Sequence, residues 1–504
     1  MNLNSSATKL ISNLRLESKI TLDLRRALPF LLGALVFAYS MSNMAGYVLS
    51  DPDTLMHITS GSWMLEHHLI PAVDPFSHNT DGLSWIAHEW LAQILMALSF
   101  EWSGFFGLRI LVASLFSLAI VCQSLFLLNR IPAIYAIFLI ALSFVSLLGH
   151  HLARPHIFTW PIVIIWLTIL LNRLEKKQWR APYILLPLMV LWANLHGSFI
   201  LGLMMIPFFF IETLLSVTRT EKIKVIKSWV LFFLLAVISS LITPYGLDGI
   251  RFSVNMVSTQ FTSTILEWKP ASGYSLLPIE YWVILLLAMG LTGYLRLPVI
   301  RLLLLLGFIH ESLAHVRFIS ILGLVTPLLI AKPFGDLYYA NHKINSKAEK
   351  ISQWGSNKKI DLGIILFTGL LYLIPIMLAK IYQQNSLNSS TAPEEAISFV
   401  KQVSPTGNVL NYYSMGGYLI YKKIPVFIDG RADLYGSEKL DEYFSIVNLE
   451  NPSTLKKVLE NHKIGWTIFP PNEKIVFFLN NQADWKMIYE DQDAVIHIKK
   501  ESSD

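Results

Sequence analysis

Long apolar runs recur along most of this chain, and they limit the folds that are open to it. A helix needs about 20 apolar residues to cross a bilayer, and the run at 28–50 is long enough to do so. Of the 504 residues, 53% are hydrophobic and 15% are charged, whereas a soluble domain carries about 25% charged residues. The sequence therefore predicts a polytopic α-helical membrane protein of about eleven spans. These are expected at 28–49, 107–128, 131–149, 157–171, 182–194, 197–215, 229–246, 281–296, 299–312, 318–331 and 361–379.

Basic residues fall in the connections between alternate runs, which predicts the orientation of the chain. They precede the first run (Lys9, Arg15, Lys19, Arg25, Arg26) and cluster at 129–130, 173–180, 219–227, 296–301 and 332–359. Loops rich in lysine and arginine stay in the cytoplasm. We therefore expect a cytoplasmic segment at 1–27, a transmembrane domain at 28–380 with an outer loop at 50–106, and an extracytoplasmic domain at 381–504. The composition fits a bacterial inner membrane.

The composition also excludes several classes of function. The net charge of +5 comes from basic residues in these connections, so it does not indicate nucleic-acid binding. The single cysteine, Cys122, excludes internal disulfides and a cysteine-based metal site. No glycine-rich phosphate loop is visible in the sequence, so a soluble nucleotide-sugar site is not expected.

The outer loop and the tail contain secondary structure of their own. The segment 54–68 predicts an amphipathic helix, and 88–102 predicts a second helix that lies flat at the outer interface. The short spans 182–194 and 197–215 are expected to form a broken helix pair that lines a cavity. The tail predicts a small α/β domain, large enough for its own core. Its helices are expected at 393–403 and 454–461, and its strands at 408–412, 418–421, 426–428, 465–469, 486–490 and 494–498.

Polar residues that do not suit a simple bundle gather at the outer ends of the spans. Several of them lie within apolar flanks, which favours a polar cavity that opens outward over a merely solvated rim, because ionisable groups at membrane depth are costly. The residues are Asp51, Asp53, His57, His88, Glu89, Arg154, His156, His196, Glu267, Lys269, His315 and Arg317.

Asp53 and His57 lie four residues apart on the expected helix and therefore share a face. With Asp51 or Glu89 they could hold a divalent cation, because carboxylate and imidazole suit such ions. Aspartate is also a favoured helix N-cap, so Asp51 or Asp53 could cap the helix instead. No other cofactor is indicated.

Arg154 and Arg317 are candidates for holding a phosphate. A guanidinium matches the geometry of a phosphate and stays charged at every relevant pH. The alternative for each is a structural ion pair with a nearby carboxylate.

At this point the residues resemble the GT-C superfamily of integral-membrane glycosyltransferases. The likeness is to the branch of the protein O-mannosyltransferases and the lipid A aminoarabinose transferase. It is carried by the aspartate after the first span, by 63–67, 87–98 and 107–111, and by Ala153-Arg154-Pro155-His156. That branch often has Asp-Glu at the start of the loop, whereas this chain has Asp51-Pro52-Asp53. The motifs at 194–197, 244–246, 267–268 and 428–436 are similar to those of an uncharacterised bacterial subgroup.

The resemblance implies transfer of a sugar from a polyprenyl phosphate to the hydroxyl of a lipid, a glycan or a protein, at the outer face of the membrane. It implies that Asp53, or else Asp51, is the catalytic general base, and that direct displacement inverts the anomeric centre. Arg154 or Arg317 would stabilise the departing phosphate. The other candidates for substrate binding are His57, His88, Glu89, His156, His196, Glu267, Asp429 and Arg431.

Asp429 and Arg431 belong to a tail motif. Gly416-Gly417-Tyr418 followed by Asp429-Gly430-Arg431 is faintly similar to the outer domain of the oligosaccharyltransferase catalytic subunit, which helps to bind the acceptor. The alternative is a strand–turn–strand in which Asp429 and Arg431 pair to fix a loop.

Two further functions stay open at the level of sequence. A transporter or flippase would line its pathway with similar polar residues, although no pseudo-repeat between halves of the chain is visible. An oligosaccharide ligase would instead use a diphosphate-linked donor.

Overall fold

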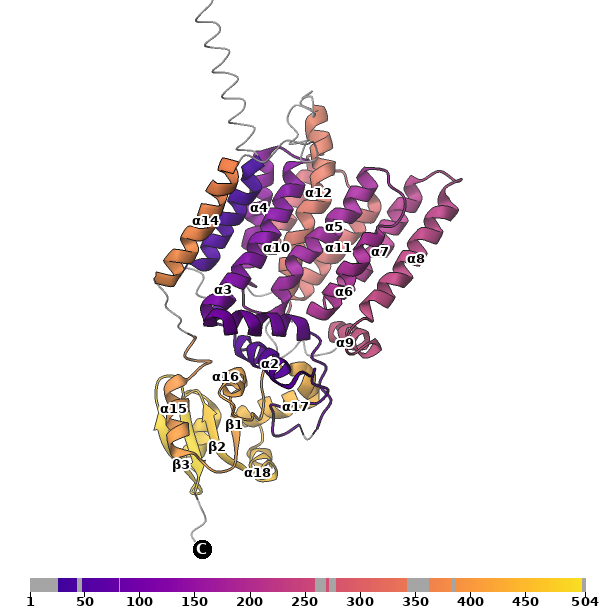
Figure 1. Cartoon of the computed structure of the whole chain (residues 1–504). Coiled ribbons are helices and arrows are strands. Elements are labelled where there is room, and N and C mark those ends of the chain that lie inside the picture. Colours follow the sequence, from indigo (N-terminus) through magenta and orange to yellow (C-terminus); the bar gives the residue numbers. More distant parts are fainter. Residues whose placement is uncertain are drawn as a thin grey trace, which may run out of the picture.

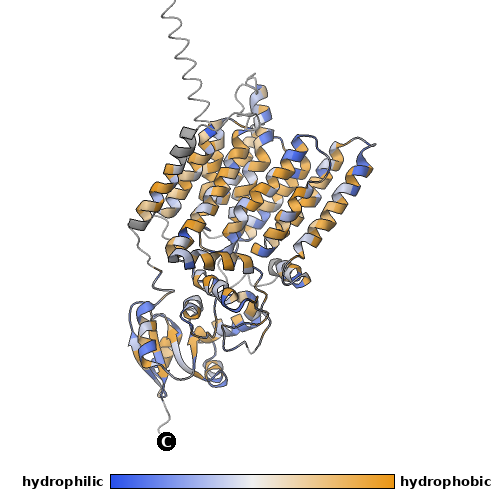
Figure 2. Ribbon diagram, in the orientation of Figure 1, coloured by the Kyte–Doolittle hydropathy of each residue, from blue (hydrophilic) through white to orange (hydrophobic). Residues whose placement is uncertain are grey.

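A bundle of apolar helices makes up most of the molecule (Figures 1 and 2). The computed structural model describes residues 26–42, 48–80, 82–258, 269–271, 278–341, 362–381 and 387–500. Each of the predicted spans contains a helix, so the polytopic helical fold is confirmed. The helices are Arg26–Met41, α3 (Trp90–Leu128), α4 (Ala133–Leu148), α5 (Thr159–Glu175), α6 (Leu186–Leu195), α7 (Phe199–Ser216), α8 (Lys222–Ser240), α10 (Pro278–Leu291), α11 (Val299–Ala314), α12 (Ile319–Asn341) and α14 (Leu362–Ile381).

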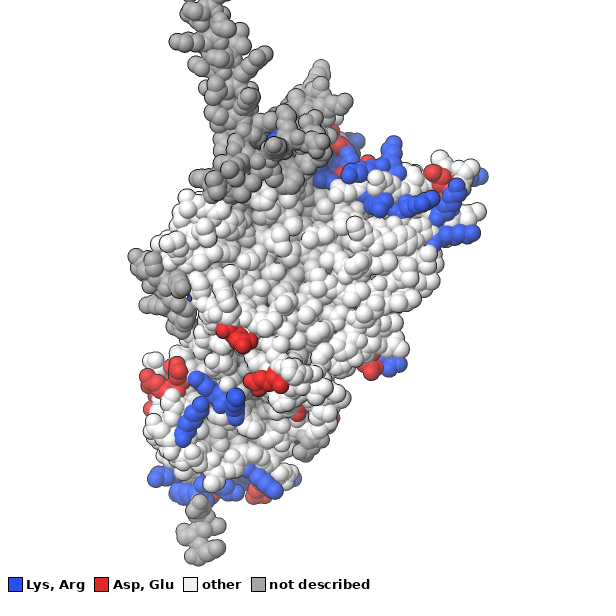
Figure 3. All heavy atoms as spheres, viewed as in Figure 1, with Lys and Arg blue, Asp and Glu red and all other residues white. Residues whose placement is uncertain are grey.

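Five of the described helices are long and apolar enough to cross a membrane as single elements. They are α3, α7, α8, α5 together with the 3₁₀ turn η2 (Pro155–Phe158), and α12 together with η6 (Val316–Phe318). Figure 3 shows lysine and arginine side chains gathered at the end of the bundle opposite the C-terminal domain, with an uncharged band between. Such a distribution is typical of a membrane protein that keeps its basic loops on one side.

Two helices lie below the bundle, at the end that faces the C-terminal domain. One is α2 (Thr54–His67), at the place of the predicted amphipathic helix. The other is the first part of α3, which turns at Ser103 and Gly104, where the backbone leaves the helical conformation. Figure 1 shows this part running across the end of the bundle, so the predicted second helix is present and crosses the bundle end, while its place at a membrane interface stays a prediction.

The break between α6 and α7 is also where the sequence places it. His196 has an extended backbone and ends α6, and α7 begins at Phe199. The indole of Trp192 donates a hydrogen bond to Ser198 Oγ across the break, at 3.0 Å. The polar residues of this turn are thereby held at the end of the bundle that faces the C-terminal domain.

The C-terminal domain is a small α/β unit, as predicted. Its strands pair in the order β1-β2-β4-β3, with β1 parallel to β2 and the other two pairs antiparallel. Its elements are α15 (Glu394–Val403), β1 (Asn408–Asn411), α16 (Gly416–Tyr421), α17 (Ala432–Val447), α18 (Pro452–Asn461), β2 (Ile464–Phe469), α19 (Lys474–Asn480), β3 (Trp485–Glu490) and β4 (Val495–Lys499).

Two of the predicted strands are wrong. The run 418–421 belongs to helix α16, because a short apolar run that is buried on all sides has no period by which to tell strand from helix. The segment 426–428 joins no strand of the sheet, and Val426 instead makes one isolated bridge with Ser77 of the outer loop.

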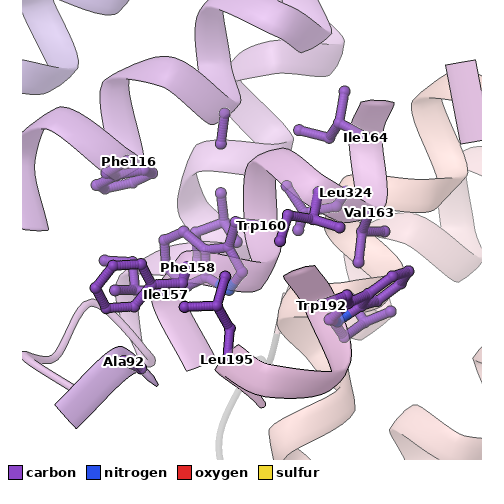
Figure 4. Close-up of a cluster of buried hydrophobic side chains, with 14 of the residues drawn as sticks. Ala92, Phe116, Ile157, Phe158, Trp160, Val163, Ile164, Trp192, Leu195 and Leu324 are labelled. Atoms are coloured by element: carbon purple, nitrogen blue, oxygen red, sulfur yellow. The ribbon is translucent and has the colours of Figure 1, made fainter. Parts of the chain in front are cut away.

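That bridge attaches the C-terminal domain to the outer loop. The Val426 N–H donates to the Phe76 carbonyl, and the His78 N–H donates to the Val426 carbonyl, both at 3.0 Å. The buried core is continuous across this junction, since one hydrophobic cluster includes bundle residues and residues of α15, α16, β2 and β4. Figure 4 shows the part of the core beneath the site, where Ile157 and Phe158 of η2 lie among Phe116, Trp160 and Leu195.

Candidate active site

A cavity of about 300 Å³ lies where the bundle, the outer loop and the C-terminal domain meet. Most of the residues predicted for the site line it together, although they come from separate parts of the chain. These are Asp53, His57, His88, Glu89, Arg154, His156, His196, Arg317 and Arg431. Asp51 and Asp429 do not line the cavity themselves. Each pairs with an arginine that does, Asp51 with Arg154 and Asp429 with Arg431. Glu267 lies outside the described residues.

Arg154 lies between the two aspartates that follow the first span. Its Nε is 2.9 Å from Asp51 Oδ1, and its terminal nitrogen Nη2 pairs with Asp53 Oδ2. The Asp53 N–H also donates to Asp51 Oδ1, at 2.8 Å. The structure therefore shows the ion-pair alternative for Arg154, and it presents Asp53 rather than Asp51 to the cavity.

The local sequence explains why Arg154 reaches this position. A residue before proline avoids the helical conformation, and Arg154 is accordingly extended ahead of Pro155, which begins η2. The Ala153 carbonyl accepts a hydrogen bond from Thr54 Oγ1 at 3.1 Å, and the Ala153 N–H donates to the Val48 carbonyl at 2.9 Å. These two hydrogen bonds hold the segment that carries Arg154 to Val48 and Thr54, which precede and follow Asp53 in the chain.

The capping alternative has a different answer for each aspartate. Asp53 occupies the N-cap position of α2, but its carboxylate makes no capping hydrogen bond. The Asp51 carboxylate does accept a hydrogen bond from a backbone N–H at the start of this helix, that of Asp53. A guanidinium lies between the two carboxylates that would share a divalent cation, and among the described residues no group of three or more His, Cys, Asp or Glu side chains is arranged to hold a metal ion. The cation therefore stays a prediction from sequence.

Glu89 lies at the centre of three histidines. Its Oε1 is 3.2 Å from His196 Nε2 and 3.6 Å from His88 Nε2, and its Oε2 is 3.9 Å from His57 Nδ1. Burial alone would raise the pKa of Glu89, but the surrounding imidazoles outweigh it and hold that pKa well below its usual value. Glu89 is therefore an anion across the physiological range.

The histidines respond differently to this anion. Burial works against the charged form of His88, but Glu89 outweighs it and raises the pKa of His88. Burial lowers the pKa of His196 to about 4 and also lowers that of His57. The Ser198 N–H donates to His196 Nδ1 at 3.0 Å, so the neutral ring directs its Nε2–H toward Glu89.

Arg431 forms a second arginine cluster, at the base of the C-terminal domain. Its guanidinium donates to both oxygens of Asp429 (2.8 and 2.7 Å), to Asp74 Oδ1 (2.6 Å) and to Ser77 Oγ (3.1 Å). The Tyr435 hydroxyl adds a hydrogen bond to Asp429, at 2.7 Å. The predicted alternative, in which Asp429 and Arg431 pair to fix a loop, is present, although the segment that follows them is helix α17 rather than a strand.

Sequence reasoning missed three residues of this arrangement. Asp433 and Gly430 both line the cavity, and Asp74 completes the Arg431 cluster. Burial raises the pKa of the Asp433 carboxyl. For Gly430 and Asp433 the signal in the sequence was the motif 428–436, and Asp74 had none.

Apolar residues of the bundle also line this cavity. They include Leu201 and Met204 of α7 and Ile321 of α12. Arg317, which precedes Phe318 in η6, lines it as well. One cavity is therefore lined both by ionised groups and by apolar side chains of the helical bundle.

Comparisons with known proteins agree with this architecture. No protein-family model and no curated protein sequence matches the chain. The fold is similar to that of the archaeal oligosaccharyltransferase AglB from Archaeoglobus fulgidus in complex with an inhibitory peptide and a dolichol-phosphate. That match covers 87% of this chain and 68% of that chain, at 12% identity and a TM-score of 0.54. The chain has the GT-C fold.

Other structures show the same similarity. The apo form of the Archaeoglobus fulgidus oligosaccharyltransferase matches over 88% of this chain and 69% of that chain, at 13% identity and a TM-score of 0.51. ArnT from Cupriavidus metallidurans, bound to undecaprenyl phosphate, matches over 94% of this chain and 98% of that chain, at 11% identity and a TM-score of 0.49. The two oligosaccharyltransferase structures therefore confirm the predicted GT-C fold.

Proposed function

We propose that this protein is a membrane glycosyltransferase that moves a sugar from a polyprenyl-phosphate donor to an acceptor hydroxyl. The observation that carries the proposal is the cavity, which is lined both by an ionised carboxylate cluster and by apolar residues of the bundle helices α7 and α12. A donor with a long hydrocarbon tail and a charged head needs both environments within one site. The GT-C fold supports the same reaction class.

Arg317 is the residue that would hold the donor phosphate. It lines the same cavity as Asp53 and stands in η6, directly before the apolar helix α12. Charge that develops on the leaving phosphate is stabilised most strongly in a site that excludes water. AglB, which has the same fold, binds dolichol-phosphate in its complex, and this similarity favours a polyprenyl phosphate here.

Asp53 would act as the general base. It would take the proton of the acceptor hydroxyl while that oxygen attacks the anomeric carbon and the bond from this carbon to the phosphate oxygen breaks. One displacement of this kind inverts the anomeric centre. General-base catalysis contributes about 10² to 10⁴ in rate. Asp51, which contacts Arg154 from behind the cavity wall, would orient the arginine rather than the substrate.

The remaining cavity residues would bind the sugar and the acceptor. Glu89, His88 and His196 offer a set of hydrogen-bond donors and acceptors that suits a polyol, and Asp433 lines the cavity on the side of the C-terminal domain. With the basic loops in the cytoplasm, this side faces out of a bacterial inner membrane. The acceptor would be a lipid, a glycan or a protein at that surface, and no step of this mechanism uses a metal ion.

The test is a comparison of surface glycans, by mass spectrometry, between wild-type, deletion and Asp53→Asn strains. The Asp53→Asn strain should reproduce the deletion phenotype with normal amounts of protein in the membrane. Asp441→Asn makes the same chemical change at an exposed position of α17 and should leave the glycans unchanged.

Two outcomes contradict the proposal. Glycans at the wild-type level in the Asp53→Asn strain would exclude Asp53 as the base. Accumulation of the lipid-linked sugar in the inner leaflet of the deletion strain would indicate a flippase instead.

A further inference from the structure

The loop 429–433 of the C-terminal domain lies directly against Asp53. A Cβ placed on Gly430 would overlap Asp53 Oδ1 and come within 2.5 Å of Asp53 Cγ and 2.8 Å of Asp53 Oδ2. Real Cβ atoms essentially never approach other heavy atoms closer than 3.0 Å. The backbone of Gly430 is therefore in contact with the carboxylate, and only glycine leaves room for it.

The loop cannot easily move away from this contact. Asp429 and Arg431, on either side of Gly430, are buried and joined to each other and to Asp74 of the outer loop. The Asn411 side chain also donates to the Ile428 carbonyl, at 2.8 Å. These side chains and the Ile428 carbonyl have their hydrogen-bond partners within a buried network. Displacing the loop would leave buried polar groups without partners, which costs free energy.

A second close contact lies one residue before Asp53. A Cβ on Gly417, at the start of α16, would overlap the Pro52 carbonyl oxygen. The C-terminal domain thus meets the start of the outer loop at two consecutive residues, through glycine backbone both times. Arg154 contacts Asp53 from the bundle, so the carboxylate lies between an element of the membrane domain and an element of the C-terminal domain.

We propose that Gly430 is a positioning residue for Asp53, so that the C-terminal domain sets the orientation of the catalytic carboxylate toward Arg154 and the cavity. This inference rests on the proposed function, in which Asp53 is the base. It predicts that even the smallest side chain at position 430 displaces the carboxylate and slows transfer, while the donor still binds.

The experiment uses the purified full-length protein in lipid nanodiscs and a detergent extract of deletion-strain membranes, which supplies the native donor and the unmodified acceptor. Sugar transfer is measured at increasing amounts of extract, and undecaprenyl phosphate is used as the probe for donor binding. Gly430→Ala should lower the maximal rate about 100-fold, the order expected for a misplacement of about 1 Å. The half-saturating amount of extract and the Kd for undecaprenyl phosphate should stay within twofold of wild type.

The matched control is Gly249→Ala in α9 (Leu247–Ser258), where a Cβ would meet only ordinary contacts at 3.5 and 3.8 Å; it should behave as wild type. Hydrogen exchange over 426–436 tests whether the loop is still docked in Gly430→Ala, and its protection should be unchanged.

A wild-type transfer rate in Gly430→Ala overturns the inference. A lower rate also overturns it if residues 426–436 lose their protection from hydrogen exchange or if undecaprenyl phosphate binds more weakly. If the wild-type protein transfers no sugar in this extract while undecaprenyl phosphate binds, the proposed function fails instead.

Discussion

Two arginines of this protein each lie between two carboxylates, and the two clusters differ in how far solvent reaches them. Arg431, with Asp429 and Asp74, is sealed, and the exposed fractions of these side chains are 3%, 0% and 0%. Arg154, with Asp51 and Asp53, borders the cavity, and the corresponding fractions are 19%, 5% and 12%. Arg431 borders the cavity, so the same chemical groups occur once almost closed to a ligand and once open to it.

The difference shows which cluster is structural and which can act on a substrate. A sealed ion pair needs both partners, since removing one leaves an uncompensated buried charge. Arg431 accordingly joins the outer loop to the C-terminal domain. A cluster at a cavity wall can exchange part of its contacts for contacts with a substrate, and that is the place where a base is useful.

Removal of the sealed arginine should have the largest effect on stability. Arg431→Ala leaves two buried carboxylates unpaired and should lower the free energy of unfolding by about 3–5 kcal/mol, measured by thermal unfolding in detergent together with limited proteolysis of the C-terminal domain. The control is Arg251→Ala, which removes an exposed pair with Asp248 and should cost about 0.5 kcal/mol or less. Equal effects of the two variants would contradict the distinction between sealed and exposed clusters.

Removal of the arginine at the cavity should affect activity more than stability. In Arg154→Ala, solvent in the cavity can hydrate Asp53, so the free energy of unfolding should fall by only about 1–2 kcal/mol. Transfer should fall at least about 100-fold, because Asp53 loses the contact that orients it. Sugar transfer and thermal unfolding of the same preparation measure both quantities. A loss of stability as large as that of Arg431→Ala, with transfer retained, would reverse the roles of the two clusters.

A smaller effect is expected from the Glu89 cluster, which is partly open like that of Arg154. Because Glu89 raises the pKa of His88 in the folded protein, the stabilisation by this pair is complete below the unfolded value of about 6.5 and is lost as the pH rises through the folded value. His88→Gln should therefore lower the free energy of unfolding by about 1.5 kcal/mol at pH 5.5, and by less at pH 9.

The control for this pH dependence is the same substitution in a Glu89→Gln background. There the difference in unfolding free energy between the proteins with and without His88→Gln should no longer narrow as the pH rises, because the anion that raises the pKa of His88 is absent. If this difference still narrows with rising pH in the Glu89→Gln background, the pH dependence comes from a group other than the His88–Glu89 pair.

The helical spans and most of the site residues could be predicted from sequence, for one physical reason. Ionisable side chains within apolar flanks, such as Arg154 and His196, are costly in a membrane unless they have partners, so their positions in the chain already indicate a shared polar site. The interfacial helix α2 followed from its amphipathic pattern and from Asp53 at its start.

The role of each residue within the site could not be predicted in the same way. Whether Arg154 binds a phosphate or a carboxylate depends on its distance from Asp51, which no local pattern encodes. Gly430 and Asp433 reach the cavity only through contacts between distant segments of the chain, and Gly430 meets Asp53 from 377 residues away in sequence. The run 418–421 was assigned to the wrong element because burial on every side removes the alternation that identifies a strand.

The contact between Gly430 and Asp53 has a consequence for biosynthesis. Asp53 leaves the ribosome long before the segment 426–436, which completes its surroundings. A nascent chain, or one cut before this segment, would therefore contain Asp53 without the wall that orients it. Activity would be gained only when this segment docks against Asp53.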